Sequence, residues 1–198
     1  MPRAGLTPQA VVDHAIDLVD VQGAEALTLA AVAAKAGVAT PSLYKHVPGG
    51  LPELRRLVAV RVTTELATAL GEAVLGRSRD VAVAALLDAY LDYAERHPYR
   101  YGALPQAPQD DAELREAAAR LVGVIIAVLR GYGLAGEEAV HAARTVRSVA
   151  HGFAALTAGG AFQLAADLAV TRERLTRVLT EGLRSWPPAE APAPAEAH

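Results

Sequence analysis

The sequence contains no cysteine, and only 5% of its 198 residues are aromatic. Without cysteine, the protein can form neither disulfide bonds nor thiolate metal sites. Long stretches in which β-branched and polar residues alternate are also absent, which argues against a sheet. The hydrophobic residues, 52% of the chain, are instead mostly Ala, Leu and Val, enough to bury a sizeable core. The composition therefore predicts an all-α protein.

The sequence also lacks an excess of positive charge and a long apolar segment. Its net charge is −3, so no general basic surface indicates nucleic acid as a partner. The longest strongly apolar run, LVGVIIAVL at 121–129, is too short to cross a bilayer, and the start MPRAGLTPQ has no signal-peptide core. We therefore expect a soluble, cytoplasmic protein with no membrane partner. Two lysines against seventeen arginines indicate a GC-rich bacterial genome.

Apolar residues at helical spacing, with Gly and Pro between them, predict about nine helices. Thr7 and Thr28 are suited to begin helices as N-caps, and Gly23 and Gly37 are suited to end them. The expected helices span about 8–22, 28–36, 40–46, 52–75, 79–96, 111–132, 136–158 and 170–185, with a further short helix in the connector 97–110.

The segment GVATPSLYKHV, residues 37–47, follows a short Ala-rich helix, TLAAVAAKAG. Two short helices separated by a Gly-containing turn predict a helix-turn-helix, whose second helix enters the major groove of DNA. Its polar side chains can reach phosphates and base edges, while Leu43 and Val47 face the core. Between residues 40 and 61, four positive residues oppose a single carboxylate, and phosphate contacts need only such local charge. From this spacing alone, a simple packing hairpin remains the alternative.

Residues 8–60 resemble the N-terminal domain of the TetR family of bacterial transcriptional regulators. The segments LTLAAVAAKAGVATPSLYKHV and LPELRRLVA carry this resemblance. The remainder is similar to a subgroup of ligand-binding domains named for a Trp-His-Gly motif, through HPYRYGALPQAP, VAHGFAALTAGGAF and LTEGL; here Ala150 stands in the place of the Trp. The resemblance implies an N-terminal three-helix DNA-binding domain at 1–50 and a C-terminal helical bundle for ligand binding and dimerisation at 51–186. The tail at 187–198 is rich in Pro and Ala, which predicts disorder.

The resemblance assigns DNA contacts residue by residue. The implied DNA-binding residues are Thr28, Thr40, Pro41, Ser42, Tyr44, Lys45, His46 and Gly50. Tyr44 and His46 are expected at phosphates. Thr40, Ser42 and Lys45 are expected at base edges.

The start of the fourth helix departs from the family pattern. Family members often place a Lys there, but the loop VPGGLPEL has none and is one residue longer. We expect the backbone N–H groups of Gly49, Gly50 and Leu51 to replace that contact, because a helix N-terminus attracts phosphate. Arg3, in the N-terminal arm, is a further candidate.

The C-terminal domain of the family dimerises and holds a small-molecule pocket. The helices at 136–158 and 170–185 resemble the pair that meets its symmetry mate in a four-helix bundle. A homodimer doubles the base contacts on a palindromic operator in double-stranded DNA. The implied effector site is mostly apolar with a few polar groups, and its candidate residues are Leu87, Tyr90, Leu91, Tyr93, Tyr101, Val122, Ile125, Ile126, Arg147, His151 and Phe153.

These pocket candidates have structural alternatives. The apolar residues at 122–126 also fit a plain core, and the tyrosines at 90 and 93 fit packing residues with solvated hydroxyl groups. Arg144, Arg147 and His151 share a helix stripe that also fits a solvated or dimer-edge face.

Motifs of enzymes are absent from the sequence. It has no Gly-x-Ser-x-Gly, no His-Glu-x-x-His and no phosphate-binding loop. Glu138 and His141 form one Glu-x-x-His, whereas helical di-iron proteins need two copies. We therefore expect no catalysis, no metal and no cofactor. The prediction is a dimeric, sequence-specific transcriptional regulator, a repressor released from its operator by a small molecule. The alternative is a helical small-molecule-binding or protein-interaction module with a vestigial helix-turn-helix.

Overall fold

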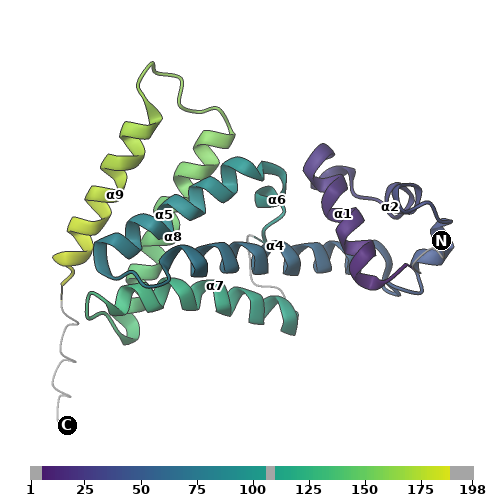
Figure 1. The fold of residues 1–198 in the computed structure, drawn as a ribbon, viewed down its shortest axis with the longest axis horizontal. Coiled ribbons are helices and arrows are strands. Elements are labelled where there is room, and N and C mark those ends of the chain that lie inside the picture. Colours follow the sequence, from purple (N-terminus) through teal and green to yellow (C-terminus); the bar gives the residue numbers. More distant parts are fainter. Residues whose placement is uncertain (1–5, 106–109, 188–198) are drawn as a thin grey trace, which may run out of the picture.

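The computed structural model describes residues 6–105 and 110–187. Within these ranges it contains nine α-helices, one 3-10 helix and no strand, which confirms the all-α class (Figure 1). The elements are α1 (Pro8–Gln22), η1 (Ala24–Ala26), α2 (Leu29–Ala36), α3 (Thr40–Leu43), α4 (Gly50–Val74), α5 (Arg79–Arg96), α6 (Pro98–Gly102), α7 (Ala112–Arg130), α8 (Gly136–Ala158) and α9 (Leu168–Arg184).

Local signals set the ends of the first two helices as predicted. The Thr7 side chain accepts a hydrogen bond from the Ala10 N–H at 3.1 Å, and Thr28 accepts one from the Ala31 N–H at the same distance. Gly37 ends α2 in the left-handed conformation, with φ of 69°, which glycine adopts at little cost. The helix-turn-helix therefore forms where the sequence places it.

The second helix of that motif is shorter than expected. The regular part of α3 ends at Leu43, and residues 44–46 continue as a turn. The Val47 N–H still donates to the Leu43 carbonyl oxygen at 2.9 Å. Leu43 and Val47 are fully buried, which confirms their predicted place in the core.

The long helix α4 connects the two ends of the molecule (Figure 1). It begins two residues before the expected position and contacts α1, α5 and α7. One stripe at four-residue spacing is almost completely buried and consists of Leu54, Val58, Val62, Leu66 and Leu70. This continuous apolar stripe faces the core along most of the helix.

Two of the remaining helices, α5 and α7, pack directly on α4, and α8 contacts both of them. α7 packs along α4, and α5 contacts both α8 and α9. A connector at 159–167 joins α8 to α9 and extends from the body (Figure 1). No helix in the described ranges is long and apolar enough to span a membrane. Arg3 and most of the tail predicted to be disordered lie outside the described residues.

Candidate DNA-binding surface and effector site

The α3 segment presents polar groups to solvent. Tyr44 is 50% exposed, and Pro41 and Lys45 are also exposed, whereas Thr40, Ser42 and His46 are half-buried. The exposed Thr28 lies at the start of α2. Its hydroxyl oxygen accepts the capping bond, so its O–H can still donate outward. All these candidates lie in the helix-turn-helix, and their DNA contacts remain predictions.

The start of α4 corrects one expectation from the sequence. The Gly49 N–H donates to the Glu53 carboxylate at 2.6 Å. The Gly50 N–H donates to the Val47 carbonyl oxygen at 2.9 Å, and Gly50 is buried. Neither N–H group is therefore available to a phosphate, because the helix start has already used them within the protein. The expected Gly50 contact loses its donor.

Gly50 instead has a structural role that can be tested. Its φ is +68°, and an added Cβ would lie 3.5 Å from a ring carbon of Tyr44. A left-handed non-glycine residue costs about 1–2 kcal/mol, so Gly50→Ala should lower the free energy of unfolding by that amount. Gly123→Ala is the control, because an added Cβ there meets nothing within 4 Å inside α7. It should stabilise the protein by about 0.5–1 kcal/mol. Calorimetric melting measures whether each substitution raises or lowers the stability. Equal changes in Tm for the two variants would contradict the structural role of Gly50.

The local positive charge is smaller in the structure than in the sequence. Arg56 pairs with Asp111 at 3.2 Å and with Glu113 at 2.7 Å, and these bonds raise the pKa of its guanidinium. Arg61 pairs with a carboxylate of α1 at 3.0 Å. Within the described residues, Lys45 and Arg55 have no carboxylate at ion-pairing distance. Of the four positive residues between 40 and 61, these two therefore carry the charge that no carboxylate pairs.

The effector candidates fall into a buried and an exposed group. The buried candidates are Leu87, Tyr90, Leu91, Tyr93, Tyr101 and Ile125, and the half-buried ones are Ile126, His151 and Phe153. Arg147 is exposed, and Val122 is 37% exposed on the outer side of α7. Val122 therefore does not join the buried group.

Three of these candidates meet in a hydrogen-bonded chain. The Tyr90 and Tyr101 hydroxyl oxygens are 3.2 Å apart, and the Tyr101 hydroxyl also bonds Nδ1 of His151. The chain connects α5, α6 and α8. Burial raises the pKa of both tyrosines, so both stay neutral at physiological pH.

Tyr93 takes part in a different site, although it lies one turn from Tyr90. Its hydroxyl donates to Glu65 at 3.3 Å, and burial, followed by the Glu65 charge, raises its pKa. Glu65 also accepts from Arg100 of α6 at 3.0 Å, and Arg100 donates twice to Asp20 of α1 at 2.6 Å. This ion-pair cluster joins α1, which packs against α2 of the helix-turn-helix, to α4 and α6. Sequence reasoning missed it, because its members are distant along the chain.

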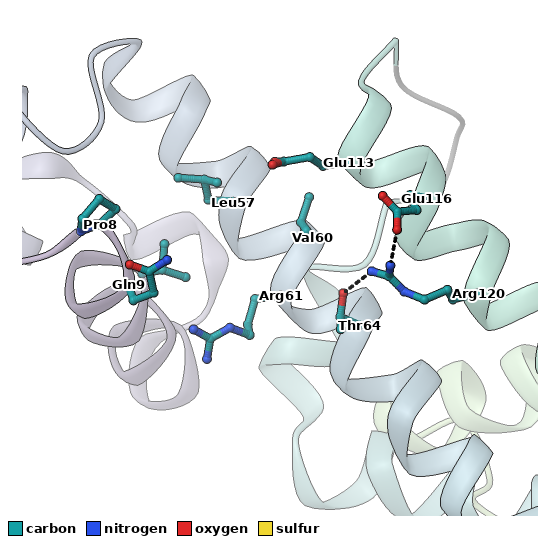
Figure 2. A pocket seen from close by; sticks show the side chains of 10 residues that line it. Pro8, Gln9, Leu57, Val60, Arg61, Thr64, Glu113, Glu116 and Arg120 are labelled. Carbon is teal, nitrogen blue, oxygen red and sulfur yellow. Dashed lines mark hydrogen bonds and ion pairs between the residues drawn. The ribbon is translucent and has the colours of Figure 1, made fainter.

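A surface groove lies between the start of α1, the middle of α4 and α7, with a volume of about 360 Å³ (Figure 2). Leu57 and Val60 form part of its apolar wall. Arg120 crosses its α7 side, donating to Glu116 at 2.6 Å and lying 3.5 Å from the Thr64 hydroxyl. None of the predicted effector residues lines it. Glu138, from the single Glu-x-x-His, accepts a hydrogen bond from the Trp186 ring N–H at 2.7 Å, so its carboxylate has a structural partner.

In this structure α2 packs against α3, and polar groups of the α3 segment are exposed. The long helix α4 connects this motif to the C-terminal helices. This arrangement is that of a helix-turn-helix transcriptional regulator. Comparison with known proteins agrees. Residues 11–48 match the family model described as "Bacterial regulatory proteins, tetR family", and residues 83–179 match "Tetracyclin repressor-like, C-terminal domain".

Two relatives extend the likeness over most of the chain. An HTH-type transcriptional regulator of Mycobacterium tuberculosis (strain ATCC 25618 / H37Rv), Rv0681, is 40% identical over 79% of this chain and 72% of its own. The HTH-type transcriptional regulator YobS of Bacillus subtilis (strain 168) is 35% identical over 92% of this chain and 95% of its own. A solved structure from Rhodococcus sp. RHA1 has the same fold, with a TM-score of 0.80 and 21% identity over 92% of this chain and 98% of that one.

The chain belongs to the TetR family of bacterial transcriptional regulators. This is a family of DNA-binding regulators and not of enzymes.

Proposed function

We propose that this chain is a dimeric, sequence-specific repressor that a small molecule releases from its operator. The observation that carries the DNA-binding part is the segment of α3 and the following turn, in which Tyr44 and Lys45 are exposed while Leu43 and Val47 are buried in the core. Such a helix can enter the major groove, where hydrogen-bonding side chains distinguish base pairs. We assign Thr40, Ser42 and Lys45 to base edges, Pro41 to a thymine methyl, and Thr28, Tyr44 and His46 to phosphates.

A homodimer through α8 and α9 is supported by their uncovered apolar side chains. Leu156 on α8 and Val170 and Val178 on α9 are 48%, 43% and 67% exposed. Exposed apolar side chains of this kind become buried when two such helices pack against a symmetry mate. A two-fold axis through these helices would cover it and present two α3 helices to a palindrome. A dimer bound at a promoter would prevent RNA polymerase from binding there and so repress transcription.

The effector acts by population shift in this proposal. In one conformation of the dimer the two α3 helices have the spacing that the operator requires, and in another they do not. A ligand that binds the second conformation more tightly lowers the fraction of protein that can bind the operator. The ratio of its affinities for the two conformations sets the size of this effect. α4 is the proposed lever, since its buried stripe runs from the helix-turn-helix into the far bundle. We place DNA binding in residues 1–50 and effector binding and dimerisation in 51–186, in a cytoplasmic protein.

The test is selection of operators from random duplex DNA by the purified protein, followed by anisotropy titrations at several salt concentrations. We expect an enriched inverted repeat and a steep salt dependence, because each phosphate contact releases counterions. No enriched motif, together with weak binding of any sequence, would reject the proposal. It would favour a helical ligand-binding module whose helix-turn-helix is vestigial.

A further inference from the structure

The hydrogen-bonded chain of tyrosines ends at a partly exposed edge of α8. Tyr90 is 4% exposed and Tyr101 is 6% exposed, whereas His151 is half-buried. The Tyr101 hydroxyl lies between the other two groups, 3.2 Å from the Tyr90 hydroxyl oxygen and bonded to Nδ1 of His151. The chain therefore leads from the core of the bundle to the imidazole ring.

The direction of these bonds follows from the chemistry of the groups. A phenol O–H is a better donor than a neutral imidazole N–H, and an imidazole nitrogen is a better acceptor than a phenol oxygen. Tyr101 therefore donates to Nδ1 of His151, and Tyr90 donates to the Tyr101 oxygen. Nδ1 is then an acceptor, so the ring proton of neutral His151 is on Nε2. The outer end of the chain is a hydrogen-bond donor.

Arg147 places a second donor beside His151. The two residues are four apart on α8, so their side chains are neighbours on the helix surface. Burial raises the pKa of Tyr90 and Tyr101, and the nearby positive charge of Arg147 opposes that shift. In the described part of the chain, Arg147 has no carboxylate at ion-pairing distance, whereas Arg100 and Arg172 each pair with two. This edge of α8 thus offers the hydrogen-bond donors of His151 and Arg147, together with the positive charge of Arg147, which no carboxylate of the described residues neutralises.

One partly exposed apolar side chain lies on the same side of α8 as Arg147. Val140 is 39% exposed and lies seven residues before Arg147, on the same side of the helix. Seven residues of helix span about 10 Å. An elongated apolar molecule can lie over this length while its polar end reaches Arg147 and His151.

We propose that Arg147 and the Nε2–H of His151 bind the carboxylate of an apolar small molecule, and that this molecule belongs to the effector class of the protein. A carboxylate matches two adjacent donors, because its oxygens only accept hydrogen bonds and a guanidinium can bind both. Tyr101 is a positioning residue, which fixes the ring and its tautomer. The inference rests on the proposed repressor function and names the chemistry of its ligand.

The test uses octanoate and its neutral analogue octanamide as probes, with affinity measured by isothermal titration calorimetry on the full chain. Octanoate should bind about 10- to 100-fold more tightly than octanamide, the range for a hydrogen bond to a charged group. Arg147→Gln should abolish this preference. Arg130→Gln should keep it, as a matched loss of an exposed arginine from α7, outside the proposed site. Tyr101→Phe should weaken octanoate binding and leave octanamide binding unchanged, which a purely structural role would not do.

Operator anisotropy, run on the same preparations, separates the two proposals. Octanoate should release wild-type protein from its selected operator and fail to release Arg147→Gln. Equal affinities for the two probes, no octanoate binding, or equal effects of the two arginine substitutions would overturn the carboxylate site while operator binding persists. Selective octanoate binding without operator release would overturn its assignment to the effector. Loss of operator binding in the wild type would reject the repressor function itself.

Discussion

Replacing Arg100 by glutamine should destabilise the protein by about 2 kcal/mol and lower its operator affinity. Arg100 makes two bonds of 2.6 Å to Asp20 and one of 3.0 Å to Glu65. Removing one partner of a buried ion pair costs about 3–5 kcal/mol. The Arg100 side chain is 19% exposed, so water screens part of the remaining negative charge and the cost is smaller.

The functional effect of this substitution follows from the helices that Arg100 connects. Asp20 lies on α1, Glu65 on α4 and Arg100 on α6. The cluster therefore fixes the helix-turn-helix against the effector-binding half. Without it, more orientations of the two α3 helices are populated, and fewer fit an operator. We expect operator affinity to fall about tenfold, which corresponds to ~1.4 kcal/mol.

Melting curves and anisotropy titrations measure the two effects. For a chain of this length, a loss of 2 kcal/mol lowers Tm by about 4–8 °C. The control is Arg96→Gln, because within the described residues Arg96 bonds only the backbone carbonyl of Asp92 in its own helix, at 3.2 Å. An Arg100 variant with wild-type Tm and operator affinity would show that the cluster holds nothing in place.

The second large effect is expected at the DNA-facing surface. The double substitution Tyr44→Phe with Lys45→Ala should lower operator affinity by about 100-fold or more. In a dimer it removes four hydrogen-bonding groups, each worth about 0.5–1.5 kcal/mol. Both side chains are exposed, so Tm should change little.

The lysine of the preceding helix supplies a matched control for this experiment. Lys35 pairs with Asp17 at 3.2 Å, so Lys35→Ala removes the same charge from the helix-turn-helix without removing a predicted DNA contact. We expect its operator affinity to stay within a few-fold of wild type. If both variants lose affinity equally, general charge and not the α3 surface governs binding. If the double variant binds as wild type, α3 does not face DNA.

The two tests also separate two roles of charged residues in this chain. Arg56, Arg61 and Arg100 hold helices together through carboxylates, and their loss should first affect stability. Lys45 has no such partner in the described residues, and its loss should first affect DNA binding. The acidic net charge of the chain is therefore compatible with a DNA-binding surface, because the acids that pair with structural arginines do not act on the phosphates.

The sequence by itself determined the helices and the helix-turn-helix. Thr7, Thr28 and Gly37 act on backbone groups within a few residues, so their effect can be read locally. The tertiary structure decided which polar groups are available for function. Tyr90 and Tyr93, one turn apart, join separate hydrogen-bond systems, and the Gly50 N–H is already bonded. Arg100 meets Asp20 across 80 residues, and no local pattern predicts such a pair, because it depends on how α1, α4 and α6 pack.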